Sequence, residues 1–330
     1  MTSVISRRQF SKTALGLGAG TLALAGGLPR NVAAADELNF QSIWLNDPEF
    51  LGYMIAIDKG YYGSEGLNVN YFPGGPNLIP EGALLSGKAD IALTNTVGLA
   101  IAVTQKGAPL RVIGTQFQKS PLGVISLASS NIKGPKDLTG KTVAAPPLSL
   151  AIFKACLAVN DVPADQVKVV PFNFDPTPLA TGNVDAVVDF VTELPFLVEQ
   201  KGGKKSGYFL FYDFGLPLYI DLVTVTEDTL KSKRNQLIAF LRASRKGWAE
   251  NDADPDKYPK EYEQTWFKGN GSSIEAMTFH NRTQIPLMTS PKGLFAMDDE
   301  GIKRNIDALA KVGINAPASM FDLSVLAELK

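Results

Sequence analysis

Residues 52–69 read GYMIAIDKGYYGSEGLNV, and the order of residue types in this stretch predicts a helix, two chain reversals and a strand. The apolar first half belongs to a helix that we expect to begin at Pro48, because proline is favoured in the first turn of a helix. Gly60 and Gly66 allow the backbone conformations that the reversals need. The strand expected at 67–72 then completes a β-α-β unit with the apolar strand that precedes the helix.

The same alternation of short apolar strands and helical segments extends over most of the chain. Strands are predicted at 38–44, 67–72, 89–94, 110–117, 122–128, 141–145, 167–172, 184–190, 208–212 and 219–226. This rhythm predicts an α/β fold of mainly parallel sheets flanked by helices. It restarts near residue 141, which predicts two lobes. Their expected boundaries are 36–120 and 221–330 for lobe 1 and 121–220 for lobe 2.

The pattern changes to helices from residue 227 onward. These helices are predicted over 234–250, 254–267, 273–286 and 298–311. We expect this helical tail to cover lobe 1, with the chain crossing between the lobes near 119–124 and 218–222.

The first 35 residues have the pattern of an export signal. Residues 6–12 read SRRQFSK, a twin-arginine pattern, and a glycine-rich apolar stretch follows at 13–28. That stretch is shorter than the roughly 20 apolar residues of a membrane-spanning helix. Small side chains up to Ala35 suit a signal peptidase. We therefore expect export by the twin-arginine route, cleavage near Ala35 and a mature protein free in the periplasm.

Composition excludes several classes of function. Without the four basic residues of the signal, the 32 basic residues of the chain fall to 28 against 33 acidic ones, which disfavours nucleic acid and anionic lipid as partners. One cysteine, Cys156, and one histidine, His280, cannot form an iron–sulfur cluster, a disulfide framework or a histidine-rich metal site. Cys156 lies in an apolar helical run, which predicts a buried thiol. For His280, in the helical tail, we expect a surface or packing role. The sequence predicts no cofactor and no metal.

Four motifs occur in the same order as in the periplasmic binding proteins for sulfonates, nitrate and thiamine-pyrimidine precursors. They are DKGYYGSEGL at 58–67, SGKADIA at 86–92, LTGKTV at 138–143 and GNVDA at 182–186. Asp90 and Asp185, within two of them, are expected to bond backbone amides. Over roughly 38–230 the chain thus resembles that family. The resemblance implies the two-lobe type II binding-protein fold, capture of a small molecule by lobe closure, a monomer, and delivery to an ABC permease and its ATPase.

Candidate ligand-binding residues follow from the position of strand ends, because ligands of doubly wound sheets lie beyond the carboxyl ends of the strands. The predicted site residues are Trp44, Asn46, Asp47, Gly74, Gly75, Pro76, Asn95, Thr96, Gln116, Gln118, Asp175, Asp189, Thr192 and Glu193. Four of them, namely Asp47, Thr96, Asp175 and Thr192, are equally suited to cap helices. Trp44 can stack on a flat ring or pack in the core, and the glycines can form a tight turn or let backbone amides approach a ligand.

The chemistry of this set favours an aromatic heterocycle. Its amides pair with ring nitrogens and carbonyls, and its carboxylates accept from an exocyclic amine. No arginine falls at these strand ends to bind an anion. Residues 189–195, DFVTELP, also resemble a stretch of the branch that binds thiamine-pyrimidine precursors or riboflavin, although Glu193 stands where that branch often has asparagine. A sulfonate, taurine or nitrate held by helix N-termini is the alternative ligand.

Two other classes of function compete with capture for import. A fungal branch that resembles this family synthesises the thiamine pyrimidine with a cysteine-rich iron motif, which is missing here. The sequence also has no nucleophile elbow or phosphate loop, so we expect no catalysis. A ligand sensor that docks on a membrane receptor is the second alternative.

Overall fold

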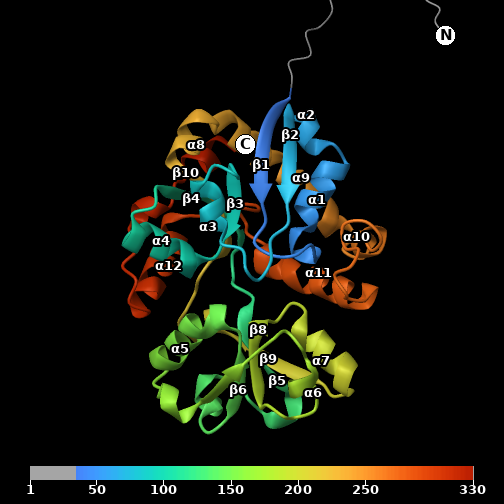
Figure 1. The fold of residues 1–330 in the computed structure, drawn as a ribbon, viewed down its shortest axis with the longest axis vertical. Helices are drawn as coiled ribbons and strands as arrows, with labels where there is room; N and C mark the ends of the chain where they lie inside the picture. Colours follow the sequence, from blue (N-terminus) through green and yellow to red (C-terminus); the bar gives the residue numbers. More distant parts are fainter. Residues whose placement is uncertain (1–34, 330) are drawn as a thin grey trace, which may run out of the picture. The chain divides into compact units, whose positions relative to one another are not determined.

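The computed structural model describes residues 35–329, whose strands form two separate five-stranded sheets (Figure 1). The first sheet has the order β2-β1-β3-β10-β4 and the second the order β7-β6-β8-β5-β9. The strands of the first sheet are β1 (Asp36–Gln41), β2 (Leu67–Phe72), β3 (Ile91–Thr94), β4 (Leu110–Phe117) and β10 (Ile220–Thr226). Those of the second are β5 (Leu122–Leu127), β6 (Thr142–Ala145), β7 (Lys168–Pro171), β8 (Ala186–Phe190) and β9 (Ser206–Leu210). We call the first sheet with its helices lobe 1 and the second sheet with its helices lobe 2.

Each sheet contains one reversed strand. β10 is antiparallel to β3 and β4, and β5 is antiparallel to β8 and β9, while β1 is parallel to both β2 and β3, and β6 to both β7 and β8. Both reversed strands come first after the chain has crossed from the other lobe. Such a strand enters at the edge where the parallel strands end, and therefore runs against them. The predicted α/β class, with two sheets flanked by helices, is confirmed, but both sheets are mixed, because each has two parallel and two antiparallel strand pairings.

Helices flank both sheets. Those that follow the strands of lobe 1 are the short 3-10 helix η1 (Pro48–Phe50), α1 (Leu51–Asp58), α2 (Tyr61–Ser64), α3 (Pro80–Leu85) and α4 (Thr96–Lys106). Those of lobe 2 are α5 (Leu150–Val159), α6 (Thr177–Ala180) and α7 (Leu194–Gly202). The C-terminal helices are α8 (Glu227–Ser232), α9 (Arg234–Ala253), α10 (Lys257–Glu261), α11 (Ile274–Met288), α12 (Asp299–Lys311) and α13 (Ser324–Glu328).

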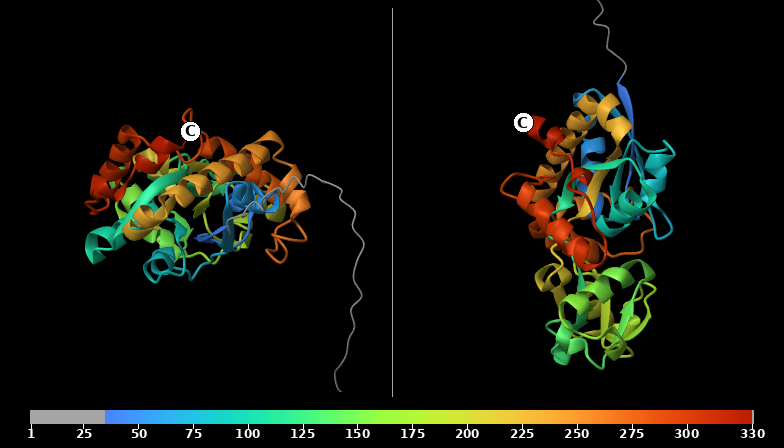
Figure 2. Two further views of the ribbon diagram at one scale, coloured as in Figure 1. Left: turned by 90° about the horizontal axis from the view of Figure 1, so that it is seen from above. Right: turned by 90° about the vertical axis from the view of Figure 1, so that its left-hand side faces the viewer.

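The helical tail packs mainly on lobe 1, as predicted. α9 lies against α1 and α2, and Figure 2 shows the orange and red C-terminal helices around the blue strands of this lobe. α11 differs, because it contacts both η1 of lobe 1 and α7 of lobe 2. The helix predicted over 254–267 was wrong in its extent. Only α10 forms there. Pro259 has no N–H to bond the carbonyl of Pro255, so the helix does not begin at 254.

The stretch 52–69 folds as predicted. Gly60 and Gly66 have φ angles of 67° and 78°, in the left-handed region that favours glycine. Gly52 allows a close approach of α1 to α9, because a Cβ at this position would overlap the ring of Trp248. Tyr53, on the same helix, stacks on Phe240 of α9 at 6.0 Å between ring centroids. The core of lobe 1 therefore depends on this helix pair.

Both lobes use the same local device between neighbouring strands. Asp90 accepts from the backbone N–H of Asn39 at 2.9 Å in lobe 1, and Asp185 accepts from that of Thr142 at 2.8 Å in lobe 2. Each aspartate thus satisfies an amide of the adjacent strand. The structural role predicted for both residues is confirmed.

Of the export signal predicted over 1–35, residues 1–34 lie outside the described residues. Among residues 35–329, no helix has both the length and the apolar character that crossing a membrane requires. The thiol of Cys156 is buried, as predicted, and burial raises its pKa to about 12.

Candidate functional site

Buried polar side chains gather at the edge of lobe 1 where its parallel strands end. Glu49 lies in η1 and is 5% exposed, and Asp221, at the start of the reversed strand β10, is 1% exposed. Gln116 joins them, since its Nε2 donates to the backbone oxygen of Glu49 at 2.7 Å and to Oδ2 of Asp221 at 3.2 Å. Asp221 also has a φ of 53°. A side chain other than glycine in this conformation is uncommon and concentrates at functional sites.

Helix α11 covers this edge and fixes η1 in place. Nε2 of Gln284 donates to the backbone oxygen of Pro48 at 2.6 Å and to Oδ1 of Asn281 at 3.0 Å. Asn281 in turn exchanges two hydrogen bonds with Asn251 of α9, at 2.9 and 2.8 Å. All three amide side chains are fully buried. The network ties η1, with its acidic residues, to the helical tail.

Lobe 2 contributes Asp189 from the end of β8, and Thr192 and Glu193 from the turn between β8 and α7. Oε1 of Glu193 accepts from the hydroxyl of Ser272, just before α11, at 2.8 Å. Oδ1 of Asp189 accepts from the backbone N–H of Phe190 at 2.8 Å. The carboxylates of lobe 2 thus face the polar edge of lobe 1.

Two aromatic pairs also join the lobes. Trp44, beyond the end of β1, lies 5.4 Å from Phe174 of lobe 2, with the ring planes at 53°. Phe196 of α7 lies 5.4 Å from Phe279 of α11. Trp44 is half-buried and Phe174 is exposed, so a flat ligand can reach this pair.

Five acidic side chains from both lobes form a group that we call the carboxyl cluster: Asp47, Glu49, Asp189, Glu193 and Asp221. None of them forms a salt bridge with a cation of the described part of the chain. Glu49 and Asp221 are buried and the other three are half-buried. Acids grouped in this way without a counter-charge are costly to ionise, because burial and like charges both oppose ionisation.

The electrostatic consequence is a set of raised pKa values. Burial raises the pKa of Asp221 to about 6 and that of Asp189 to about 7. Burial also raises the pKa of Asp47 well above its usual value, and Glu193 adds to the shift. The pKa of Glu49 is raised well above its usual value by burial and then by the charge of Asp221. Ionising the whole cluster at once is therefore unfavourable, and a ligand that donates hydrogen bonds to its carboxyl oxygens offsets part of that cost.

Polar atoms without partners concentrate at the same place. Six of the twelve buried side-chain nitrogen and oxygen atoms that lack a hydrogen bond within 35–329 lie on residues beside the cluster: Asn46 Oδ1, Gln116 Oε1, Thr192 Oγ1, Gln284 Oε1 and both ring nitrogens of His280. Buried polar atoms are nearly always bonded in native proteins. Their concentration at one place indicates a site that bonds a ligand.

The structure brings together part of the predicted site. Asn46, Asp47, Gln116, Asp189, Thr192 and Glu193 lie at the carboxyl cluster, and Trp44 lies at the aromatic pair with Phe174. Asp47 also caps η1, as predicted, by accepting from the N–H of Glu49 at 2.8 Å. Whether these residues contact a ligand stays a prediction.

Other predicted residues have structural bonds instead. Asn95, and not Thr96, caps α4 by accepting from the N–H of Gly98 at 2.7 Å, so the cap predicted at Thr96 was wrong. The Thr96 hydroxyl bonds the backbone oxygen of Tyr219, and Nε2 of Gln118 bonds that of Ala296 at 2.8 Å.

Two further predicted residues are exposed. Asp175 accepts from the N–H of Thr177 at 2.9 Å, which lowers its pKa. Pro76 is exposed as well.

The glycine turn after β2 supports Trp44. The N–H of Gly74 donates to the backbone oxygen of Trp44 at 2.7 Å, and the N–H of Gly75 donates to the backbone oxygen of Ile43 at 3.3 Å. A Cβ on Gly74 would overlap the backbone of Ile43. The two glycines thus hold the segment after β1 by backbone contact.

We therefore expect Gly74→Ala to destabilise the protein by about 1–3 kcal/mol, as overpacking does. Gly82→Ala is the matched control. Gly82 lies in α3 with nothing within 4 Å of a Cβ, so alanine should raise stability slightly through its higher helix propensity. Urea unfolding of the two variants tests this, and equal stability of both would contradict the role of Gly74.

Sequence reasoning missed Glu49, Asp221, Ser272 and Gln284. Of the two roles expected for His280, its 3% exposure excludes the surface role and leaves the buried one. Asp221 starts a reversed strand, so a search of strand ends passes over it. The α11 residues come from a distant part of the chain, and no local pattern indicates that they return to η1.

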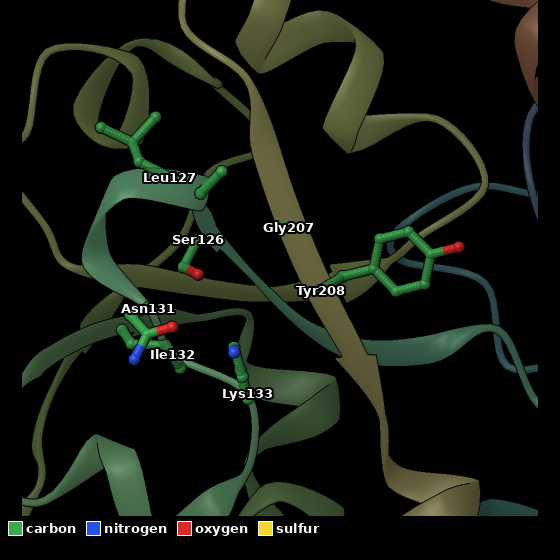
Figure 3. Close-up of a pocket in the computed structure, with 8 residues that line it drawn as sticks. Ser126, Leu127, Asn131, Ile132, Lys133, Gly207 and Tyr208 are labelled. Atoms are coloured by element: carbon green, nitrogen blue, oxygen red, sulfur yellow. The ribbon is translucent and has the colours of Figure 1, made fainter.

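A cavity lies elsewhere, on lobe 2 (Figure 3). It has a volume of about 240 Å³ and lies beside the last residues of β5 and the edge strand β9. Its lining consists of Ser126, Leu127, Ala128, Asn131, Ile132, Lys133, Gly207 and Tyr208. None of these belongs to the carboxyl cluster.

Comparison with known proteins gives relatives that share the sequence pattern. The formylaminopyrimidine-binding protein of Halalkalibacterium halodurans is 29% identical over 209 residues, which are 62% of this chain and 62% of that protein. The riboflavin-binding protein RibY of Chloroflexus aurantiacus is 22% identical over 234 residues, or 69% of this chain and 66% of RibY. The chain therefore spans slightly less than two thirds of each of these relatives.

A solved structure shares the fold. The periplasmic aliphatic sulphonate binding protein SsuA of Escherichia coli superposes with a TM-score of 0.65 at 13% identity, covering 86% of this chain and 95% of that chain. The two-lobe binding-protein architecture inferred from the motifs is thus confirmed. The family described as NMT1/THI5 like matches residues 47–258. Since this match covers more than half of its residues, the chain belongs to the NMT1/THI5-like family.

Proposed function

We propose that this protein is the solute-binding component of an ABC importer and captures a small aminated heterocycle, such as an aminopyrimidine, between lobe 1 and lobe 2. The observation that carries this proposal is the carboxyl cluster, to which both lobes contribute and which has no cation partner in the described chain. The relatives that bind formylaminopyrimidine and riboflavin support the same class of ligand. The proposal includes a periplasmic location and export by the twin-arginine route.

The polarity of the site favours an N–H-rich ligand over an anion. Carboxylates and amide oxygens are acceptors, and Asn46, Gln116 and Gln284 each have a buried amide oxygen without a partner. A sulfonate or nitrate would add negative charge beside five acids, which is unfavourable in a site of low dielectric. An exocyclic amine instead supplies the donors that the site lacks. The pair of Trp44 and Phe174 offers a surface on which the flat ring can stack.

Capture would follow from binding to both lobes at once. The crossings between the lobes are residues 118–121 and 211–219, and the first is anchored by two N–H groups, of Gln118 and Lys119, that donate to Leu287 at 3.0 and 3.1 Å. A ligand that contacts Asp47 on lobe 1 and Glu193 on lobe 2 binds best when these residues are close. It therefore shifts the population toward the closed arrangement, which the permease would recognise.

We propose binding without turnover. The Cys156 thiol is buried, with its pKa raised to about 12, and lies in α5 of lobe 2, away from the cluster. The Ser272 hydroxyl lies beside the cluster and donates to Glu193, but neither ring nitrogen of His280 bonds it, so the site holds no serine–histidine pair. A ligand recovered from the protein should be chemically unchanged.

A thermal-shift panel on the mature protein tests this function. The probes are 4-amino-5-hydroxymethyl-2-methylpyrimidine, riboflavin, taurine, an alkanesulfonate and nitrate. We expect the aminopyrimidine to raise the melting temperature, because a ligand at 100 times its Kd stabilises by about 2.7 kcal/mol. Mass spectrometry should then recover it intact. A response to taurine or nitrate alone would contradict the proposed ligand, and conversion of the probe would contradict binding without turnover.

A further inference from the structure

His280 is the one histidine of the sequence, and it lies in the middle of α11 with 3% of the residue exposed. Neither ring nitrogen has a hydrogen-bond partner among residues 35–329. A neutral imidazole always has one donor and one acceptor nitrogen. Leaving a buried donor unbonded costs about 1–3 kcal/mol, so an imidazole at this depth indicates a group that bonds something other than the protein itself.

The ring points toward the site because of its place on the helix. His280 and Gln284 share one face of α11, since residues four apart are neighbours on a helix. Gln284 donates to the backbone oxygen of Pro48, which places this face against η1. Glu49 lies in η1, and Asp47 caps it. The face that carries His280 is therefore turned to the lobe 1 half of the carboxyl cluster.

The charged groups around His280 leave it neutral. Glu193 faces it from lobe 2 and raises the pKa of the imidazole, but burial lowers that pKa by more. Glu49 and Asp47 lie at η1, against which this face of α11 packs through Gln284. The charged residues of α11 itself, Glu275 and Arg282, are both exposed. A neutral imidazole can give one N–H to a ligand at physiological pH.

The other buried polar atoms without partners at the site indicate which ligand atom the imidazole N–H would bond. The amide oxygens of Asn46, Gln116 and Gln284 only accept, and the Thr192 hydroxyl can accept or donate. Such a site suits the amine of a heterocycle, but the amine of a pyrimidine stands next to a ring nitrogen, which is an acceptor. That nitrogen needs a donor. His280 is the buried nitrogen-bearing side chain without a partner at this place.

We propose that His280 is a ligand-contacting residue that donates its imidazole N–H to the ring nitrogen or carbonyl beside the ligand's amine. Together with the carboxyl cluster it distinguishes an amino-heterocycle from a simple aromatic amine. The inference rests on the proposed function, since it specifies contacts of the same site.

The binding test compares two probes of equal shape. In 3-methylaniline both ring nitrogens of 4-amino-2-methylpyrimidine are replaced by C–H, so the acceptor is lost and the amine is kept. By calorimetry, His280→Phe should weaken binding of the aminopyrimidine about tenfold or more, as expected for one lost hydrogen bond. Binding of 3-methylaniline should change less than about threefold. His280→Gln, which keeps a donor, should restore part of the affinity.

Thr278→Val is the matched control, because Thr278 also has an unpartnered buried oxygen on α11 but lies two residues away, on the opposite face. It should leave both affinities unchanged. An equal loss for both probes in His280→Phe would show a packing role and overturn the inference. If the wild-type protein binds neither probe, the proposed function and the inference both fail.

A second measurement needs no variant. Protein labelled with ¹⁵N-histidine, without a histidine tag, gives imidazole signals from His280 alone. On addition of 4-amino-2-methylpyrimidine, the signal of the donating ring nitrogen should shift and its N–H proton should become observable. Binding heat without any change in these signals would overturn the role of His280 while leaving the proposed function intact.

Discussion

Glu193→Gln should weaken binding of an aminopyrimidine by roughly 10- to 100-fold. A hydrogen bond to a charged group contributes about 1.5–3 kcal/mol, and the substitution removes the charge while keeping the size of the side chain. The amide oxygen can still accept from Ser272, which now bonds Oε1 at 2.8 Å, so the fold should be kept. The ligand-free protein should become slightly more stable at neutral pH, because one member of a cluster of like charges is gone.

Glu199→Gln is the matched control for this prediction. Glu199 lies in α7, the helix that begins directly after Glu193, and also accepts from a serine, through the hydroxyl of Ser206 at 3.1 Å. It is exposed and outside the carboxyl cluster. Calorimetry should show that Glu199→Gln binds the aminopyrimidine with the affinity of the wild type. Equal affinities of Glu193→Gln and the wild type would remove Glu193 from the site.

The ligand-free protein should lose stability as the pH rises from 5 to 8. Burial raises the pKa of Asp221 to about 6 and that of Asp189 to about 7, whereas an unfolded aspartate titrates near 3.9. Between those values the folded protein binds more protons than the unfolded chain, so unfolding becomes easier as pH rises. At about 1.4 kcal/mol for each pKa unit, Asp189 contributes a loss of about 3 kcal/mol above pH 5 and Asp221 about 1 kcal/mol.

Other titratable groups change the stability between pH 5 and pH 8 only slightly, or in a direction that follows from their pKa shifts. The pKa values of Glu65 and Glu250 are lowered, so the stability they add is lost only as the pH falls below about 4.5, outside the window. The lowered pKa of His280 acts in the opposite sense to the cluster, since it costs stability as the pH falls below about 6.5. The raised pKa values of Asp47 and Glu49 add to the loss with rising pH.

Urea unfolding at pH 5 and pH 8 measures this difference. Asp189→Asn should reduce it by about 2–3 kcal/mol, because the uncharged amide does not titrate. Asp175→Asn is the control, since Asp175 is exposed and its pKa is lowered. A wild-type protein that is more stable at pH 8 than at pH 5 would contradict the burial of the acids.

The sequence predicted those parts of the molecule that depend on local patterns. Gly60 and Gly66 mark turns, Asp90 and Asp185 satisfy amides of neighbouring strands, and the alternation of strands and helices gives two sheets flanked by helices. The rule of strand ends also located Asp189, next to the turn that holds Glu193. These predictions succeed because each depends on a few consecutive residues.

The remainder of the site depends on topology and on contacts between distant segments. Asp221 lies at the site because β10 runs against its neighbours, so the start of this strand meets the ends of the others. In the sequence, Glu49 looks like an ordinary acidic residue in the first turn of a helix. It is buried because Gln116 and helix α11 pack against η1. Gln284 and His280 reach η1 from more than 200 residues along the chain. No pattern within either segment predicts that contact.

The most direct test of recognition by the carboxyl cluster is a calorimetric comparison of 4-amino-2-methylpyrimidine with 2-methylpyrimidine on the mature wild-type protein. The two compounds differ only in the amine that the acids would bind. The account predicts one site per chain and an affinity for the amine-bearing compound that is roughly 100-fold higher, as two hydrogen bonds of about 1.5 kcal/mol would give. Equal affinities for the two compounds, or binding of an alkanesulfonate in place of both, would contradict it.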